Sequence, residues 1–343
     1  MRTILHRFLI IGLSLASWLN LSAFNENTGT IIFHEVAVVY TFGESVFFQT
    51  RIKSSERIDE ALLHLAMTGQ STRVIPVKAN ADGVFSHDLD PRIDPIRPYA
   101  NIVYWYTVID DRGSETASRR YSFTYADTRF DWAVQTDGML QIFWNAPEQE
   151  LSDEVMEIAR RSFASANERY PVFLRESIKI YLYQNERDLL QILPAGQHTW
   201  TAAIAYPEDS TIILALPTPK NQRRELERLL PHEITHVLQY AHSLDNYTYL
   251  PGWLVEGSAT LSELNPEAER STVVLSAAKT NALIPLYELC ARFPTDDAAA
   301  RLAYGEAESF VNYLSLQYGV KSLLQLADET QPGRDCRDVF FAV

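Results

Sequence analysis

The feature that most constrains the fold of this chain is a change in its hydrophobic period near residue 128. From Thr30 to about Tyr125, short runs of β-branched and aromatic residues such as residues 102–108 (IVYWYTV) are separated by turn signals such as residues 111–113 (DRG). Short strands with turns between them are typical of a β-sandwich. After residue 128 such runs become fewer and helical spacing takes over. Strands first and helices later predict an α+β arrangement.

The second half is predicted to hold a small sheet and many helices. Strand-like runs lie at residues 132–144, 177–183 and 211–216. Asp137-Gly138 marks a hairpin turn in the first of these runs. Ser152 is expected to cap a helix, and nearly everything after Asn221 has helical spacing.

The N-terminus has the composition of a secretory signal peptide. Basic residues precede an apolar core at residues 8–19, and Ala23 ends a segment typical of a cleavage site. The core is shorter than the roughly 20 residues that a spanning helix needs. We therefore expect a secreted or extracytoplasmic protein with no stable membrane span after cleavage. An uncleaved anchor is the alternative, because Leu21 stands where a small residue is usual.

Length and patterning together predict the domain limits. A chain of 343 residues with 46% hydrophobic residues is long enough for two domains with sizeable cores. The strand–turn–strand pattern of the first half resembles immunoglobulin-like or fibronectin-III-like modules. We predict a signal peptide over residues 1–23, a β-sandwich domain over 24–128 whose partner the sequence does not identify, and a mainly helical domain with a small sheet over 129–343.

Charge and cysteine content exclude several classes of protein. The formal net charge of -14 makes the chain a poor candidate for binding nucleic acid, since that affinity comes largely from Lys and Arg on phosphates. Two cysteines are too few for a disulfide-dense scaffold or a Cys-built zinc finger. Cys290 and Cys336 can pair in an oxidising compartment or remain as buried free thiols.

The residues with the clearest chemistry form the pentapeptide 232–236, HEITH. On a helix, His232 and His236 share one face and can bind the same metal ion through neutral imidazoles. Glu233 lies one residue further round and can act as a general base on a water molecule without being a ligand. Pro231 is expected to kink this helix or to start a new one just before the ligands.

A carboxylate suited to be the third ligand follows 20 positions after His236. Glu256 lies within residues 251–257 (PGWLVEG), a spacing that allows one loop and a return helix. A catalytic zinc site uses three protein ligands and one open position. If Glu256 is not the third ligand, Glu263 is the next candidate, because it lies two helical turns further along.

HExxH followed by Pro-x-Trp-Leu-x-Glu-Gly resembles the gluzincin metallopeptidases, and most closely the exported bacterial peptidase MA-like group. The resemblance spans roughly residues 130–343 and implies a zincin-like domain that binds Zn²⁺ and cleaves a peptide or protein substrate. It implies that His232, His236 and Glu256 are the metal ligands and that Glu233 is the catalytic base.

Three further features bear on this resemblance. Residues 302–310 look like the helix start that follows in this group, where Tyr304 is either a donor to the oxyanion or a packing residue. Thr260 stands where some gluzincins carry an acid that orients a ligand histidine, so that partner is unidentified. Residues 200–206 are expected to form an edge strand that holds an extended peptide, with Ala202 and Ala203 where glycine is frequent.

The sequence therefore predicts an exported zinc metallopeptidase. The alternatives are a cell-surface binding protein whose peptidase-like domain has little or no turnover, and a zinc hydrolase that acts on a non-peptide bond. An intact HExxH together with Glu256 argues against the first alternative, because a scaffold has no need of Glu233.

Overall fold

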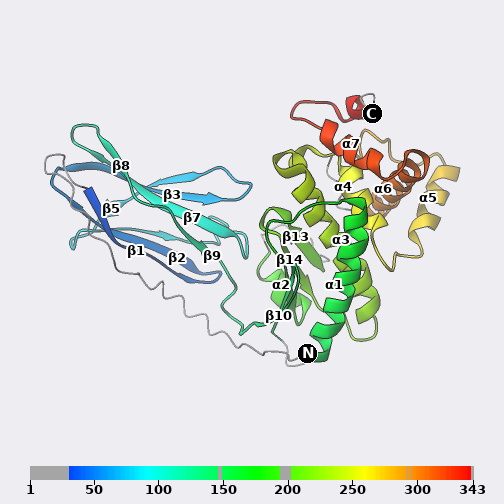
Figure 1. Cartoon of the computed structure of the whole chain (residues 1–343), viewed down its shortest axis with the longest axis horizontal. Helices are drawn as coiled ribbons and strands as arrows, with labels where there is room; N and C mark the ends of the chain where they lie inside the picture. The colour runs from blue at the N-terminus through cyan, green and yellow to red at the C-terminus, as the bar shows by residue number, and fades with distance from the viewer. Residues whose placement is uncertain (1–30, 146–148, 194–201, 292, 295, 341–343) are drawn as a thin grey trace. The chain divides into compact units, whose positions relative to one another are not determined.

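The computed structural model describes residues 31–145, 149–193, 202–291, 293–294 and 296–340. The chain divides into two compact units, and the main boundary between them lies between Asp131 and Trp132 (Figure 1). The predicted signal peptide lies outside the described residues, as do residues 194–201. None of the helices in the described ranges has the length and apolar character needed to cross a bilayer.

The first unit consists of two antiparallel sheets. One sheet has the order β1-β2-β6-β5 and contains β1 (Ile31–Thr41), β2 (Ser45–Ser54), β6 (Val84–Leu89) and β5 (Lys78–Ala79). The other has the order β4-β3-β7-β8 and contains β4 (Arg73–Pro76), β3 (Ile58–Met67), β7 (Asn101–Asp110) and β8 (Glu115–Ala117), while β9 (Tyr121–Thr124) also pairs with β7. The sheets meet through aromatic rings, since the Phe48 ring of β2 lies 5.3 Å from that of Tyr104 in β7. The predicted β-rich first half is confirmed, and its immunoglobulin-like topology stays a prediction.

The second unit is built on a mixed five-stranded sheet. Its order β10-β11-β12-β14-β13 comprises β10 (Ala133–Asp137), β11 (Leu140–Trp144), β12 (Ile178–Tyr183), β14 (Thr211–Ala215) and β13 (Ala203–Tyr206). The three middle strands are parallel and the two outer strands are antiparallel to their neighbours. The predicted hairpin turn at Asp137-Gly138 joins β10 to β11. The antiparallel strand β13 forms one edge of this sheet.

Two long helices, α1 (Gln149–Arg169) and α3 (Gln222–Ser243), lie side by side and pack on the sheet (Figure 1). Their apolar residues at helical spacing share one buried core with the middle strands, as Ile158, Ile234 and Ile212 illustrate. Ser152 lies inside the first turns of α1 and is buried, so its predicted role as the cap is wrong. The helix begins at Gln149 because the residues before Ser152 are themselves good helix formers.

A second core is formed by α4 (Gly252–Leu261), α6 (Asp297–Tyr318), α7 (Lys321–Glu329) and α8 (Cys336–Phe340). The short helix α2 (Glu186–Leu190) packs instead on β12 and β14, and α5 (Arg270–Lys279) packs on α6. Trp253 of α4, Ala307 of α6 and Leu323 of α7 belong to the second core and are almost fully buried. Helices α3 and α4 are in contact although they belong to different cores. The contact between α3 and α4 therefore joins the two cores.

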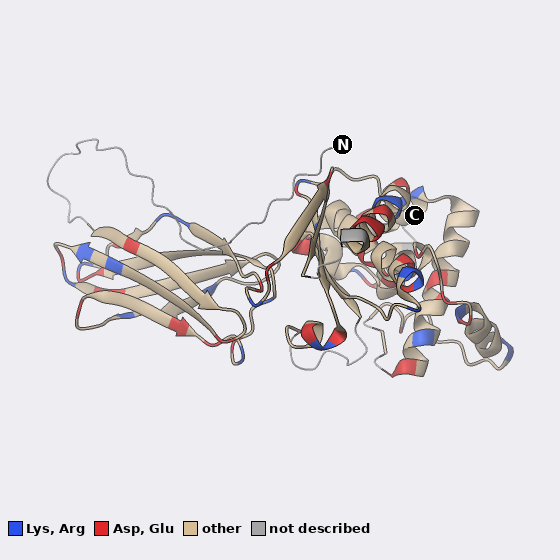
Figure 2. Ribbon diagram, turned by 90° about the horizontal axis from the view of Figure 1, so that it is seen from below, with Lys and Arg blue, Asp and Glu red and all other residues tan. Residues whose placement is uncertain are grey.

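Acidic and basic residues are interspersed over the helices of the second unit (Figure 2). Arg223 of α3, for example, pairs with Glu154 and Glu157 of α1, at 3.3 and 2.9 Å. Exposed pairs of this kind contribute little to stability. The expectation that the chain does not bind nucleic acid stays a prediction.

Candidate metal centre

Helix α3 continues through Pro231, so the predicted new helix start at this residue is wrong, while the predicted kink stays a prediction. Proline has no N–H to offer the carbonyl four residues earlier. That carbonyl, of Glu227, accepts instead from the backbone N–H groups of Leu264 at 2.9 Å and Asn265 at 3.3 Å. The lost helical bond is thus replaced, and the segment after α4 is tied to α3.

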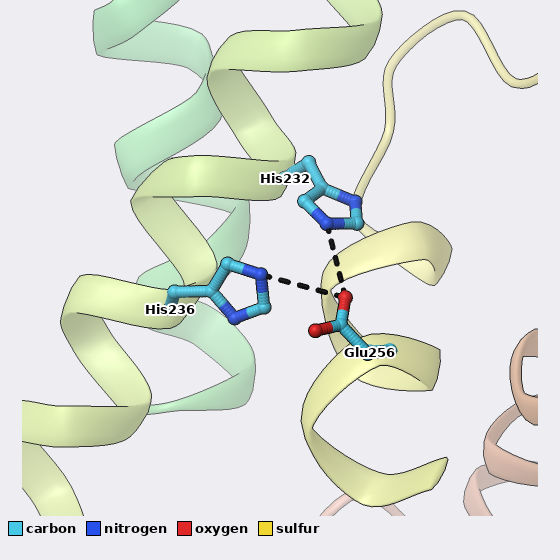
Figure 3. Close-up of side chains that lie close together, drawn as sticks. All are labelled: His232, His236 and Glu256. Atoms are coloured by element: carbon cyan, nitrogen blue, oxygen red, sulfur yellow. Dashed lines mark ion pairs between the residues drawn. The ribbon is translucent and has the colours of Figure 1, made fainter. Parts of the chain in front are cut away.

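Two imidazoles from α3 and one carboxylate from α4 point at a common centre (Figure 3). Nε2 of His232 and Nε2 of His236 lie 3.3 and 3.6 Å from Oε2 of Glu256. Ligand atoms about 2.0–2.1 Å from a tetrahedral zinc ion are separated by about 3.3–3.4 Å. The structure therefore brings the three predicted ligands together at a separation that suits such an ion.

The buried oxygen of Glu256 is a second sign that a cation fits here. Oε2 has no hydrogen-bond partner of acceptable geometry among the described residues. Leaving a buried carboxylate oxygen without a donor is costly. A divalent cation between Glu256 and the two imidazoles would remove that cost.

The orientation of the His236 ring is fixed by Gln239. The Gln239 amide nitrogen donates to the main-chain carbonyls of Leu254 at 3.3 Å and Val255 at 3.1 Å. Since carbonyls only accept, the amide oxygen must face Nδ1 of His236, which lies 3.2 Å away. An acceptor there requires Nδ1 to carry the proton, which leaves Nε2 free to bind a metal. The Tyr247 hydroxyl also lies 3.4 Å from Nδ1.

The outer nitrogen of His232 has a carboxylate partner. Nδ1 lies 3.5 Å from Oε1 of Glu263, which is buried and paired with Arg270 at 2.9 Å. Thr260 occupies the position where an orienting acid was sought, but it is buried and its hydroxyl has no hydrogen-bond partner in the described part of the chain. Glu263 therefore contacts the outer nitrogen of His232 and lies outside the cluster of His232, His236 and Glu256.

The cluster is electrostatically coupled. Burial alone would raise the pKa of Glu256, but the nearby imidazoles of His236 and His232 and the phenol of Tyr304 outweigh burial and lower it. Burial lowers the pKa of His232, yet the nearby carboxylates of Glu256 and Glu263 outweigh burial and raise the pKa to about 10. Without a metal ion His232 is thus protonated at neutral pH, so binding an ion there releases a proton.

Residues 251–257 place Glu256 by fixing the start of α4. The Gly252 and Trp253 amides donate to the carbonyls of Cys290 at 3.1 Å and Leu289 at 2.8 Å. Cys290 is disulfide-bonded to Cys336, with Cα atoms 6.1 Å apart. The Trp253 indole N–H lies 3.4 Å from the Cys336 sulfur. The first turn of α4 is therefore anchored to a cross-linked segment.

Gly257 allows α4 to approach α6. A Cβ atom at this position would lie 2.5 Å from the carbonyl oxygen of Ala307 and 2.8 Å from a methyl group of Val311. Only glycine fits this crossing without a shift of backbone. The glycine after Glu256 therefore sets the distance between the helix that carries Glu256 and the helix that carries Tyr304.

Tyr304 lies inside α6, which begins at Asp297, so its predicted place at a helix start is wrong. Helix α6 begins earlier because Asp296 caps it by accepting from the Ala299 amide at 3.0 Å. The Tyr304 phenol is close enough to Glu256 to lower the pKa of that carboxyl group, and the Tyr304 ring lies 6.1 Å from that of His232. Burial and the charge of Glu256 raise the pKa of Tyr304, so the phenol keeps its proton.

A cleft of about 400 Å³ opens on this cluster. Its lining includes His232, Glu233 and Tyr304 together with Ala202–Ile204 at the start of edge strand β13. The small side chains of Ala202 and Ala203 thus border the cleft. Of the expected edge strand, residues 200 and 201 lie outside the described residues.

A further histidine of α3 lies outside this cluster and has a partner of its own. His242 pairs with Asp328 at 2.9 Å. His198 lies outside the described residues.

Three residues that contact the cluster or its neighbours were not predicted from the sequence in these roles. They are Gln239 beside His236, Glu263 beside His232, and Arg270 beside Glu263. The contact of Gln239 with His236 could have been predicted, because residues three positions apart lie on the same face of a helix. Arg270 and Glu263 meet through a turn, and no helical spacing points to their contact.

A helix that carries HExxH, a second helix that adds a glutamate, and a cleft bordered by an edge strand together define a metallopeptidase-like protein. The family model of the Peptidase MA superfamily matches residues 159–343, which is more than half of the chain. The chain belongs to this superfamily. The comparison with curated proteins gives no match.

Three solved structures are similar to parts of this structure. An M1 zinc metallopeptidase from Deinococcus radiodurans is 14% identical, with 83% of this chain and 82% of that chain covered and a TM-score of 0.36. A mutant two-domain M1 zinc metallopeptidase bound to L-arginine is 14% identical, with 87% and 84% covered and a TM-score of 0.39. A family 56 carbohydrate-binding module that binds β-1,3-glucan is 16% identical, with 27% of this chain and 98% of that chain covered and a TM-score of 0.20. Because all three TM-scores are low, the assignment of the chain rests on the family match.

Proposed function

We propose that this protein is an exported zinc-dependent peptidase in which His232, His236 and Glu256 hold the metal ion. The observation that carries the proposal is the buried Oε2 of Glu256, which lies 3.3 and 3.6 Å from two imidazole nitrogens and lacks a hydrogen-bond partner of acceptable geometry. The outer nitrogens of both imidazoles face acceptors. Each ring therefore presents an unprotonated Nε2 to the centre once the ion has displaced the proton of His232.

A zinc ion bound at this centre supplies a Lewis acid that polarises the scissile carbonyl and acidifies a water molecule. Glu233 lines the same cleft and is almost fully buried. Its carboxylate accepts a proton from the attacking water as the oxygen bonds to the carbonyl carbon. Glu233 then delivers that proton to the amine nitrogen as the C–N bond breaks.

Tyr304 stabilises the oxyanion in this proposal. Its phenol stays protonated, as the raised pKa indicates, and lies within hydrogen-bond reach of Glu256. A neutral phenol donates to a developing negative charge without bringing a charge of its own. The substrate is proposed to lie extended along β13, with backbone groups of this edge strand as partners.

Export is supported by the apolar core at residues 8–19 and by the disulfide between Cys290 and Cys336, which suits an oxidising compartment. N-terminal sequencing of the protein recovered outside the cytoplasm tests this. A mature chain that begins after Ala23 is expected, and one that still begins at Met1 would indicate an anchor.

Metal analysis and peptide turnover, measured side by side on Glu233→Gln and Glu256→Gln, test the catalytic proposal. Glu233→Gln should keep zinc near full occupancy and lose about 10²–10⁴-fold in rate, because the ligands stay intact. Glu256→Gln should lose metal and activity together. A wild-type protein that binds zinc but cleaves no peptide in a library would favour the binding protein, and hydrolysis of other bonds alone would favour the non-peptide hydrolase.

A further inference from the structure

We propose that Glu263 is a positioning residue that orients the metal ligand His232, and that Arg270 holds Glu263 in place. This inference rests on the proposed function, because orientation of His232 matters only if His232 binds a metal ion. Oε1 of Glu263 lies 3.5 Å from Nδ1 of His232, the nitrogen that faces away from the metal centre. An acceptor at Nδ1 directs the proton there and frees Nε2 for the metal.

Arg270 prevents the Glu263 carboxylate from turning away. One guanidinium nitrogen, Nη2, lies 2.9 and 3.2 Å from the two oxygens of Glu263, while Nη1 reaches Glu308 at 3.1 Å. The side chains of Arg270 and Glu263 are only 7% and 2% exposed. The contacts of Arg270 with both carboxylate oxygens restrain the orientation of Glu263. The pair is also costly to break, because removing either partner leaves an uncompensated buried charge.

Gly305 gives Arg270 its path across α6. A Cβ atom at Gly305 would lie 2.7 Å from Cγ2 of Val274 and 3.0 Å from Cγ of Arg270. The arginine stem therefore passes over α6 beside Tyr304. The chain Glu308–Arg270–Glu263–His232 links the helix that carries Tyr304 to the helix that carries two metal ligands.

The backbone next to Glu263 is restrained as well. Pro231 leaves the Glu227 carbonyl without its helical partner, and that carbonyl accepts from Leu264 and Asn265. The residue after Glu263 is thus bonded to α3 one turn before His232. Side-chain and main-chain contacts restrain Glu263 independently, as expected if its position relative to His232 matters.

The test measures zinc affinity and stability of the full mature chain, stripped of metal and then titrated with Zn²⁺ against a chelating dye. In Glu263→Gln the amide oxygen must face Arg270, which only donates, so an NH₂ group faces Nδ1 of His232. That arrangement favours the wrong tautomer, and zinc affinity should fall by about 10–100-fold. Glu269→Gln is the matched control, because it removes the same charge one residue before Arg270 at an exposed position.

A triple variant, Glu263→Leu with Arg270→Met and Glu308→Gln, separates orientation from packing, because the Glu308 carboxylate would otherwise lose its partner Arg270. Replacing a buried ion pair by apolar residues of similar size often preserves stability. We expect its urea midpoint to lie nearer the wild type than that of Glu263→Leu alone, while zinc affinity stays at least about tenfold weaker. Recovery of both quantities would assign Glu263 a packing role and overturn the inference.

The outcomes also separate this inference from the proposed function. If the wild type binds no zinc, the proposed metal site is wrong and the role of Glu263 falls with it. If the wild type binds zinc and Glu263→Gln binds it equally well, only the inference is overturned.

Discussion

Replacing Gln239 by methionine removes the acceptor that fixes the His236 tautomer while it keeps the length of the side chain. In the native protein the amide oxygen faces Nδ1 at 3.2 Å, and the amide nitrogen is held by the Leu254 and Val255 carbonyls. After the substitution, the Tyr247 hydroxyl at 3.4 Å becomes the nearest partner of Nδ1. A hydroxyl can donate as well as accept, so the tautomer is no longer determined.

The expected magnitude follows from these contacts. Loss of a partner behind a ligand histidine typically costs 10–100-fold in metal affinity, which is about 1.4–2.7 kcal/mol. Unfolding free energy should fall by about 1–3 kcal/mol, because buried polar groups lose a partner. Gln239→Glu should lower stability further, since a carboxylate cannot donate to the two carbonyls, although it still offers His236 an acceptor.

Two measurements test this prediction. Zinc titration gives the affinity, and long-range ¹H–¹⁵N spectra of the imidazoles of the metal-free protein report which nitrogen of His236 carries the proton. The expected results are an Nδ1–H tautomer in the wild type and a mixture in Gln239→Met. An unchanged tautomer together with zinc affinity within twofold of the wild type would refute the reasoning.

Three further predictions follow. Gly257→Ala should lower the unfolding free energy by about 1–3 kcal/mol in a urea titration, because the new Cβ would lie 2.5 Å from the Ala307 carbonyl oxygen and this clash exceeds the gain in helix propensity; an unchanged midpoint would contradict it. Replacing Cys290 and Cys336 by serine should cost up to ~4 kcal/mol, as expected for a cross-link between residues 46 positions apart, and an equally stable variant would argue against the disulfide. Because the pKa of His232 is raised to about 10, zinc affinity should increase about tenfold per pH unit below that value, and calorimetry in buffers of different ionisation enthalpy should detect the released proton; a pH-independent affinity would show that His232 is already neutral.

Local periodicity in the sequence was enough to predict secondary structure and the side chains that share one face of a helix, because both depend on residues close together in the chain. A period of 2 before residue 128 and helical spacing after it indicated a β-rich half followed by a mixed half, and the structure has both. The spacing of His232 and His236 places both on one helix face whatever surrounds the helix. The first turns of α1 and α6 were misplaced, because helix ends depend on caps and flanking residues more than on periodicity.

Only the tertiary structure decided which groups contact the outer nitrogens of His232 and His236. Glu263 meets His232 because the turn after α4 is bonded to a carbonyl that Pro231 leaves free, and Arg270 reaches Glu263 because Gly305 has no side chain. The distance from Glu256 to the imidazoles is set by the crossing of α4 with its neighbours. These contacts join residues from separate helices, and no repeat along the chain encodes them, since they arise from how buried surfaces pack and how buried polar groups find partners.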